Sequence, residues 1–334
     1  MAAAACGSSA SSGSASSGSA ASGKPLTDVT LAFPFYGAGD VPFFLAQEKG
    51  YFAAEGLNVK FTVVTSSVAL QAASAGSVQM VYTTTIRPIK TLASGESMYA
   101  FMPVNIGFTD DVIMSASAYE AAGLTPSSTL KQQMEALANK PVGIISAGGE
   151  NAEVWEYLFH LAGIPASEVK TVALGSPAAN LAALKRGSIA ATNLGGTQPG
   201  TAVAAGYAKY LVRLSENQVA SMNDVISDVV VASSSYAQAH PTVLTGFVAA
   251  YKKAVAYTYA NPAAAANLVY EKFPTYFSDE PKDQYLAEFN LLLKEKQLDP
   301  DPTMSASQLT ALGNFLTATG QTIPSNWRQV FTKP

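Results

Sequence analysis

Strand-like and helix-like segments alternate through the first two thirds of the chain, and this alternation constrains the fold more than any other feature. The segment DVTLAFPF places Val29, Leu31 and Phe33 at a period of two, which is typical of a strand. Asp40 suits an N-cap and Pro42 the first turn of the helix that follows. Further strands are predicted at LNVKFTVV, VQMVYTTT, KPVGIIS, EVKTVAL and SIAATNLG. Strands that alternate with helices favour parallel sheets covered on both faces, so we expect an α/β fold of two units in series.

Composition narrows the classes of protein further. The 334 residues are enough for one large domain or two lobes of roughly 150 residues. The formal net charge is −4 and no basic stripe appears, which argues against nucleic acid as a partner. No apolar run reaches the length of about 18 residues that a membrane-spanning helix needs. One Cys and two His argue against a disulfide framework and against a cysteine or multi-histidine metal site. From about residue 235 onward the pattern is mainly helical.

The first 26 residues form a separate unit. Cys6 is followed by a Ser/Gly/Ala tract that cannot bury apolar surface and behaves as a flexible coil. The small residues before Cys6 resemble the lipobox of a bacterial lipoprotein, although Ala3 stands where Leu is usual and the charged and apolar parts of a signal peptide are missing. The alternative is a Ser/Gly-rich tail whose Cys is incidental. We expect Cys6 to carry a lipid anchor and residues 1–26 to act as a linker.

Four loops that follow predicted strands are the candidate binding region. They are rich in Gly, Thr, Ser, Asn or Gln and cover residues 36–40, 83–85, 146–151 and 193–198. In open α/β sheets, ligands bind beyond the carboxyl ends of the strands. Several of these loops lead into helix N-termini, whose free backbone amides can donate to a ligand. No G-x-S-x-G elbow or Walker-type phosphate loop accompanies them, so we expect a binding site without catalytic residues, metal or cofactor.

Four blocks resemble one known family. VPFFLAQEKGYFAAEGLNVKF is similar to the signature of periplasmic solute-binding proteins of the nitrate/sulfonate/taurine (NitT/TauT) class of ABC importers. Its matching residues are Glu48, Lys49, Gly50, Tyr51, Phe52, Glu55, Gly56 and Leu57. The other blocks are KPVGIISAGGENAEVWEYLFHLAGIPASEVKTVAL, AALKRGSIAAT and HPTVLTGFVAAYKKAVAYTYANP. The resemblance covers nearly everything from about Thr27 to the end.

The resemblance implies a type II periplasmic binding protein fold. Two α/β lobes are joined by two crossover segments, and the solute is held in the cleft between them. The first lobe is expected over residues 27–115 plus 228–334 and the second over 116–227. The implied partners are a small solute and the permease of an ABC importer. The protein would be a monomer at the periplasmic or extracellular face of the bacterial cytoplasmic membrane.

The resemblance also places residues of the four loops at the cleft. In the first lobe these are Tyr36, Gly37, Gly39, Asp40, Tyr82, Thr83 and Thr84. In the second lobe they are Gly148, Gly149, Glu150, Asn151, Trp155, Asn193 and Gln198, with Asp228 near the second crossover. Phe33 and Phe35 share one face of the predicted strand and are expected in the core, and Phe43 and Phe44 suit either the core or the pocket.

Several of these candidates have an equally good structural interpretation. Thr suits a strand end and a helix cap, which accounts for at least one of the three threonines after the third strand. Glu150 and Asn151 suit helix caps. Trp155 fits the cleft and the sheet packing equally well, and Asp228 fits the cleft or a strand end. Arg87 suits a surface ion pair.

The charges in these loops favour a neutral or weakly basic organic solute. Arg87 is the single cation, against Asp40, Glu150 and Asp228. An aromatic heterocycle stacked on Tyr36, Tyr82 or Trp155 fits this environment, and the thiamine-pyrimidine precursors bound by relatives of the family are a concrete example. One alternative is a sulfonate, taurine or nitrate-type anion held by backbone amides. Another is a pyrimidine synthase-like enzyme, which we disfavour because its cysteine-rich motif is absent.

Overall fold

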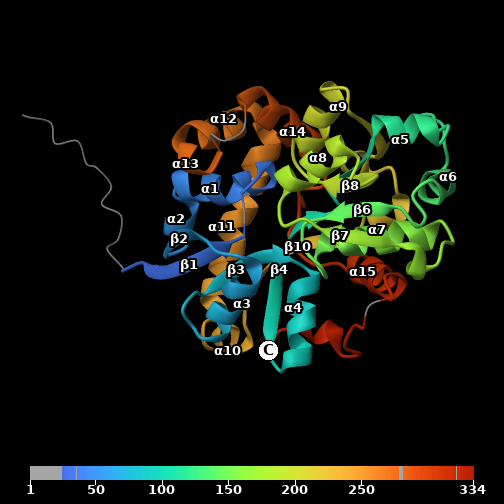
Figure 1. The fold of residues 1–334 in the computed structure, drawn as a ribbon. Coiled ribbons are helices and arrows are strands. Elements are labelled where there is room, and N and C mark those ends of the chain that lie inside the picture. The colour runs from blue at the N-terminus through green and yellow to red at the C-terminus, as the bar shows by residue number, and fades with distance from the viewer. Residues whose placement is uncertain (1–24, 35, 278–280, 321) are drawn as a thin grey trace, which may run out of the picture.

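The computed structural model describes residues 25–34, 36–277, 281–320 and 322–334, and these residues form two lobes (Figure 1). In the first lobe the described strands form a five-stranded sheet of order β2-β1-β3-β10-β4. Its strands are β1 (Thr27–Phe33), β2 (Leu57–Val63), β3 (Met80–Thr84), β4 (Met98–Ile106) and β10 (Ile226–Ser233). In the second lobe the order is β7-β6-β8-β5-β9. Its strands are β5 (Asp111–Ser115), β6 (Pro141–Ile144), β7 (Lys170–Ala173), β8 (Ala191–Leu194) and β9 (Ala208–Val212).

Each sheet contains one reversed strand, so the expectation of parallel sheets is only partly right. β10 runs antiparallel to β3 and β4, and β5 runs antiparallel to β8 and β9. Both reversed strands directly follow a crossover, at residues 107–110 and 213–225. Because the chain arrives there from the other lobe, it enters the sheet at the cleft end and runs away from it.

Two parts of the expected lobe division need correction. The expected boundary at residue 115 placed residues 111–115 in the first lobe, but β5 pairs within the second sheet. Helix α15 (Ala306–Ala318) was expected in the first lobe, but it packs both against β10 of the first sheet and against α7 (Glu150–Leu161) of the second lobe. Phe315 of α15 lies 4.8 Å, ring centre to ring centre, from Tyr157 of α7 and 5.1 Å from Phe108 of the first crossover. The apolar core is therefore continuous from one lobe to the other.

Helices cover both faces of each sheet. On one face of the first sheet lie α1 (Val41–Glu48), α2 (Tyr51–Ala54), α11 (Pro241–Ala260), α12 (Pro262–Lys272), α13 (Pro274–Phe277) and α14 (Lys282–Lys294). Toward its other face lie α3 (Ser66–Ser74) and α4 (Ile86–Thr91), while α10 (Ser234–Ala239) follows β10. The remaining helices of the second lobe are α5 (Ala116–Ala121), α6 (Leu130–Glu135), α8 (Pro177–Arg186) and α9 (Gln198–Ala204).

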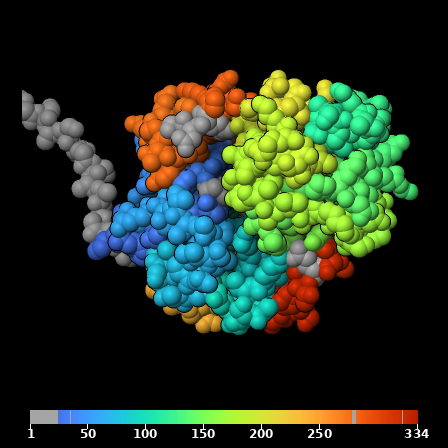
Figure 2. All heavy atoms as spheres, viewed as in Figure 1, coloured from blue at the N-terminus to red at the C-terminus, as the bar shows by residue number. Residues whose placement is uncertain are grey.

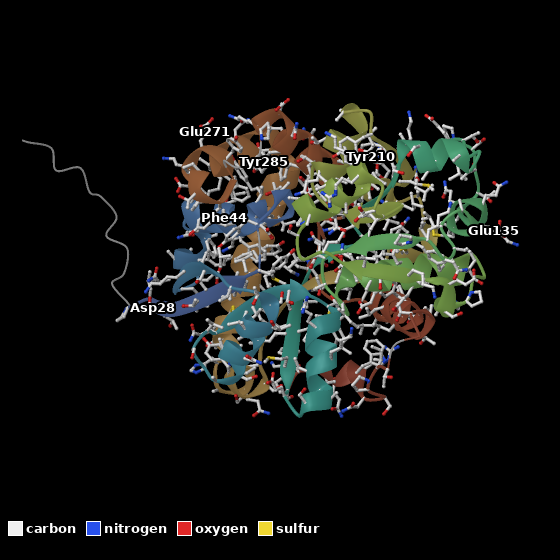
Figure 3. The ribbon with its side chains drawn as sticks, viewed as in Figure 1. Asp28, Phe44, Glu135, Tyr210, Glu271 and Tyr285 are labelled. Atoms are coloured by element: carbon white, nitrogen blue, oxygen red, sulfur yellow. The ribbon has the colours of Figure 1, made fainter. Side chains whose placement is uncertain are left out.

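The aromatic residues around the first strand belong to the core. Phe33, Phe43 and Phe44 are fully buried, and the Phe33 ring lies 5.3 Å edge-on from Phe43 and 5.4 Å from Tyr82. Figure 3 shows Phe44 within the helical layer of the first lobe, the same layer that holds Tyr285. Each such ring pair adds roughly 0.5–1.5 kcal/mol beyond the area it buries. Of the rings flanking the first loop, Phe33, Phe43 and Phe44 therefore hold the floor of the cleft in place and do not line it.

Candidate functional site: the cleft between the lobes

The loops of the two lobes meet across a hollow that is visible between them in Figure 2. Lys90 of α4 crosses it to Glu153 of α7, with 2.8 Å between Nζ and Oε1, and also donates to the Gly148 carbonyl at 3.1 Å. On the opposite rim, a Cβ built at Gly196 would lie 3.7 Å from the Glu288 carboxylate of α14. The structure is therefore closed, with loops of both lobes in contact.

Asp40 holds the first loop of the cleft in place. It ends the short 3-10 helix η1 (Ala38–Asp40), which leads directly into α1. Its Oδ2 accepts a 2.9 Å hydrogen bond from the Gly37 amide, which fixes the turn. Its Oδ1 has no hydrogen-bond partner among the described residues, although the side chain is only 2% exposed. One oxygen of Asp40 therefore fixes the start of η1, and the other is left for a ligand. The side chain makes no capping hydrogen bond to α1, so the expected N-cap role is confirmed only for the position of the residue.

Polar side chains from three neighbouring strands of the first sheet are hydrogen-bonded to one another beside this loop. Asn105 of β4 donates to the Tyr82 hydroxyl of β3 at 3.1 Å and to Asp228 Oδ2 of β10 at 3.0 Å. The strand register explains this, because Asp228 pairs with Thr84 on one side and Asn105 on the other. The hydroxyls of Thr83 and Thr84 are also buried without a partner in the part of the chain that the structure describes. A Cβ at Gly39 would lie 3.4 Å from the Asn105 amide, so the first loop packs directly on this group.

The second lobe contributes a similar group of hydrogen-bonded polar side chains to the cleft. Asn151 of α7 donates to Asp110 Oδ2 at 2.6 Å and to the Asn193 carbonyl at 3.2 Å, and Asn193 donates back to the Asn151 carbonyl at 3.1 Å. Asn193 is fully buried, and its Oδ1 and Gln198 Oε1 lack partners within the described ranges. Gly195 is required here, because any Cβ would lie 2.6 Å from Asp110 Oδ1. Asp110 itself lies in the first crossover, between the lobes.

Four carboxyl groups face one another in this cleft. Burial, followed by the charges of Asp228 and Asp111, raises the pKa of Asp110 to about 7. Burial also raises the pKa of Asp228 to about 6, although hydrogen bonds from Asn105, Tyr82 and Ser227 act against it. The pKa values of Asp40 and Glu150 are raised well above their ordinary range by burial and by the charge of Asp228, while Arg87 pulls the pKa of Glu150 down. The cleft therefore resists carrying its full negative charge when it is empty.

Most of the candidate residues come together at this cleft. Tyr36 lies half-buried at its edge, its ring 4.5 Å from Tyr276, and its hydroxyl has no partner among the described residues. Gly148 adopts φ +65° beside Lys90, and Gly149 is the N-cap residue of α7. Asn151 bonds to Asp110 and caps no helix. Arg87 points toward the second lobe, 3.8 Å from the position of a Cβ at Gly149.

Trp155 is not at the cleft. Its side chain is fully buried in the core of the second lobe, where its indole nitrogen donates to the Gly143 carbonyl at 3.2 Å. It lies one turn further along α7 than Asn151, with its ring turned toward the sheet. The interpretation that placed it against the solute is therefore wrong.

The sequence patterns missed several residues that the fold brings here. Asn105 lies one residue before the end of β4, a strand that the sequence patterns did not predict. Asp110 lies in a crossover, and Tyr276 and Glu288 lie in two C-terminal helices. Asn105 carried a signal, since a polar side chain interrupts the apolar run FMPVNI. Asp110 carried another, in the pair of acids Asp110 and Asp111. Such signals mark a polar site without saying which side chains meet.

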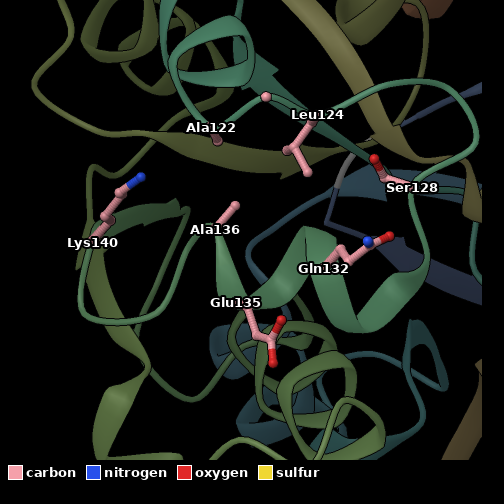
Figure 4. Close-up of a pocket in the computed structure, with 8 residues that line it drawn as sticks. Ala122, Leu124, Ser128, Gln132, Glu135, Ala136 and Lys140 are labelled. Carbon is pink, nitrogen blue, oxygen red and sulfur yellow. The ribbon is translucent and has the colours of Figure 1, made fainter.

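A separate depression of about 450 Å³ lies at the outer edge of the second lobe (Figure 4). It is lined by the loop that follows α5, by α6 and by the segment after α6, including Gln132, Glu135 and Lys140. It lies far from the cleft carboxylates, and apart from Leu124 its walls are small or polar residues. We assign the candidate site to the cleft because the buried unpartnered atoms and the shifted pKa values gather there.

Two further types of site are not found. Within the described ranges, no group of three or more His, Cys, Asp and Glu side chains is arranged to hold a metal ion. No helix among the described residues has the length and apolarity needed to cross a bilayer. Cys6 and Phe35 lie outside the described residues, so the structure does not bear on the lipid anchor expected at Cys6 or on the core position expected for Phe35.

Comparison with known proteins agrees with this architecture. A family profile described as "NMT1/THI5 like" matches residues 39–265. The periplasmic aliphatic sulphonate binding protein of Escherichia coli superposes with a TM-score of 0.66 at 16% identity, covering 91% of this chain and 98% of that one. A Candida albicans protein described as having the generic periplasmic binding protein fold gives 0.70 at 16% identity, with coverage of 92% and 97%. The periplasmic nitrate-binding protein of Synechocystis PCC 6803 gives 0.61 at 16% identity, with coverage of 78% and 69%. No curated protein sequence matches the chain.

The two lobes, the two crossovers and the cleft define a periplasmic binding protein fold. Because the family profile matches more than half of the residues, the chain belongs to the NMT1/THI5-like family. Its fold is the one that these periplasmic binding proteins share. The expected resemblance to the nitrate/sulfonate/taurine class is confirmed at the level of the fold.

Proposed function

We propose that the protein captures a small organic solute in the cleft between its lobes and delivers it to the permease of an ABC importer. The observation that carries this proposal is the concentration of buried, unpartnered polar atoms at the cleft. They come from both lobes, and in the described residues they belong to Tyr36, Asp40, Thr83, Thr84, Asn105, Asn193 and Gln198. Leaving one such atom unsatisfied costs about 1–3 kcal/mol, and nearly all buried polar groups in native proteins are paired. A bound solute would supply the missing partners.

The proposed solute is neutral or weakly basic, such as a nitrogen heterocycle of the thiamine-pyrimidine type. Tyr36 and Tyr276 offer aromatic surface at the edge of the cleft. The Escherichia coli relative is named for sulphonate binding and the Synechocystis relative for nitrate binding. Here an anion would meet the carboxyl groups of Asp40, Asp110 and Asp228, whose pKa values burial already raises, so it would bind well only where they are protonated. Anions therefore remain the second candidate class, supported by the relatives alone.

The proposed mechanism is closure of the lobes about the two crossovers. The open form exposes the loops of both lobes, and the solute then bridges them. Closure occurs because the solute has a higher affinity for the closed form. We place the division between the lobes within residues 107–110 and 213–225, with α15 spanning both. The closed lobes would then be what the permease recognises.

Anchoring and assembly complete the proposal. A lipid on Cys6 would hold the protein at the outer face of the cytoplasmic membrane, and the tract that follows would act as a flexible tether. We expect the protein to act as a monomer. Mass spectrometry of the protein from its native membrane tests the lipid, and light scattering tests the monomer.

A thermal-shift screen tests the proposed function. The purified protein is heated in the presence of pyrimidines and other heterocycles, amines and amidines, and sulfonates and nitrate. A solute at about 100 times its Kd adds about 2.7 kcal/mol to the free energy of unfolding, which shifts Tm measurably. Small-angle scattering then checks that the active compound also compacts the protein. Failure of every class to raise Tm or to compact the protein would contradict a solute-binding role.

A further inference from the structure

Four of the unpartnered atoms at the cleft are side-chain oxygens that accept hydrogen bonds. They are the oxygens Asp40 Oδ1, Asn105 Oδ1, Asn193 Oδ1 and Gln198 Oε1, which have no partner in the described part of the chain. The orientation of the two asparagines follows from their bonds. The Asn105 NH₂ faces the Asp228 carboxylate, and the Asn193 NH₂ faces the Asn151 carbonyl, so in each case the oxygen is the free end. The unpartnered hydroxyls of Tyr36, Thr83 and Thr84 can donate or accept, so the free groups of the cleft that have a single hydrogen-bonding role are acceptors.

The charges around these acceptors are of one sign and come from both lobes. Asp40 and Asp228 belong to the first lobe, Glu150 to the second, and Asp110 to the crossover between them. The charge of Arg87 lowers the pKa of Glu150. Arg87 lies at the edge of the four acids, where α4 faces the second lobe. The pKa values of these acids are raised in the empty cleft, and a bound cation would favour their ionised forms and be attracted to them. A metal ion does not fit, because the described acids form no group with ligand geometry.

We propose that the solute is an organic cation that carries several N–H donors, such as a guanidinium, an amidinium or a primary ammonium. This inference rests on the proposed capture of a small organic solute and replaces the neutral or weakly basic class given there with a cationic one. The donors would reach Asp40 and Asn105 in the first lobe and Asn193 and Gln198 in the second, so the cation would bridge the lobes. Its organic part would lie against Tyr36 and Tyr276, whose rings also attract positive charge.

This assignment makes distinctions that charge alone would not. A quaternary ammonium such as choline has the charge but no N–H group, so it would leave the acceptors unpaired. A sulfonate has acceptors only and the wrong charge. A neutral aminopyrimidine has N–H donors but lacks the positive charge that the carboxylates attract. N–H donors combined with positive charge are therefore the property that the cleft selects.

The test compares four sets of compounds of similar size by thermal shift and by isothermal titration calorimetry. The sets are guanidines, amidines and primary amines; quaternary ammonium compounds; neutral heterocycles; and sulfonates with nitrate. The test variant is Asp40→Asn, which keeps one oxygen for the Gly37 amide and turns the free acceptor into a donor. The control variant is Glu135→Gln on α6, an exposed carboxylate at the outer edge of the second lobe (Figure 3).

We expect the set with cationic N–H donors to raise Tm for the wild type and for Glu135→Gln. Asp40→Asn should bind the best of these compounds at least about tenfold more weakly, which corresponds to about 1.4 kcal/mol. Tm shifts confined to anions, neutral heterocycles or quaternary ammonium compounds would overturn this inference and leave the proposed function standing. No response to any set would count against both. Unchanged affinity in Asp40→Asn would overturn the assignment of Asp40 even if cations bind.

Discussion

At the scale of single residues, the side chains of the cleft hold the structure with one atom and leave another free. Asp40 fixes the turn at Gly37 through Oδ2, and Asn105 joins Tyr82 and Asp228 through its NH₂ group. Their second oxygens are buried and have no partner among the described residues. Burying such atoms lowers stability, so the empty closed form stores a free-energy cost that a ligand would remove.

The pH dependence of the empty protein follows from the raised pKa values. The pKa is about 7 for Asp110 and about 6 for Asp228 in the folded state, against an ordinary value of 3.8. Between pH 4 and pH 7, Asp110 and Asp228 therefore keep protons in the folded state that they have already released in the unfolded state. The free energy of unfolding therefore falls as pH rises from about 4 to about 7. We expect Tm to fall across this window.

Matched variants identify the source of this pH dependence. Asp110→Asn and Asp228→Asn should each flatten the fall in Tm, while Glu135→Gln should not. Other charged and titratable groups of the cleft also act on Asp110 and Asp228 or on their neighbours. They are Asp40, Tyr82, Arg87, Asp111, Glu150, Glu153 and Glu288. A Tm that rises between pH 4 and pH 7 in the wild type would contradict the raised pKa values.

Trp155 offers a test that separates core from cleft. In Trp155→Phe the hydrogen bond to the Gly143 carbonyl and part of the ring volume are lost. We expect the free energy of unfolding to drop by about 1–3 kcal/mol, measured by urea denaturation. The affinity for the solute should stay the same. A large loss of affinity with little loss of stability would return Trp155 to the binding site.

Sequence patterns could place some of these residues because local rules sufficed. Asp40 and the threonines of β3 lie where a strand ends and a helix begins, so the general rule for α/β sheets identifies them. Trp155 could not be placed, since the choice between cleft and core depends on how α7 is rotated against the sheet. Asn105 and Asp110 were missed because only the pairing of β4 with β10 and the path of the crossover bring them to the site.

At the scale of elements, the segment after α14 ties the two crossovers together. Gln297 is fully buried, and its side-chain NH₂ donates to the Phe108 carbonyl of the first crossover at 3.0 Å and to the Leu214 carbonyl of the second at 2.9 Å. Its backbone continues the edge of β4, where the Ile106 amide donates to the Gln297 carbonyl. This C-terminal segment therefore joins the two crossovers to each other and forms a third part of the hinge.

Replacing Gln297 tests the role of this segment. Gln297→Leu keeps most of the volume but leaves two buried carbonyls without their donor. We expect a loss of about 2 kcal/mol in the free energy of unfolding, measured in urea. Gln329→Leu, in the C-terminal turn away from the hinge, is the matched control. Equal stability of the two variants would show that the hinge does not depend on Gln297.

The ion pair between α4 and α7 belongs to the closed form. Lys90 reaches Glu153 from the other lobe, and opening the lobes would separate them. Burial raises the pKa of Glu153 to about 7, although the hydrogen bond and the charge of Lys90 act against this shift. We expect Lys90→Met to weaken solute binding on the order of tenfold, because it destabilises the closed form that the solute needs. Titration calorimetry measures the loss.

A second substitution checks that this effect comes from the pair. In Lys90→Met with Glu153→Gln the buried carboxylate is also neutralised, so much of the lost affinity should return. If the double variant binds no better than Lys90→Met, then Lys90 acts through some other contact.

At the scale of the whole molecule, the two lobes are less separate than the chain order indicates. The alternation of strands and helices predicts two α/β units, and both sheets confirm this. Only the family resemblance predicted that the chain returns to the first lobe, because the periodicity of a strand does not indicate which sheet the strand joins. The place of β5 and α15 was not foreseen, since both depend on contacts between segments that are distant in sequence. The result is a hinge with a continuous core beneath an acidic cleft.

The central claim is that the lobes close on a solute, and a distance between them tests it most directly. Spin labels at Glu271 of α12 and Lys185 of α8, both exposed, report the separation across the cleft after Cys6 is replaced by Ser. We expect a broad or longer distance in the empty protein and a shorter, narrow one when a compound that raises Tm is added. The Asp40→Asn variant should not respond to the same compound. A distance that is the same with and without a compound shown to bind would contradict closure as the mechanism.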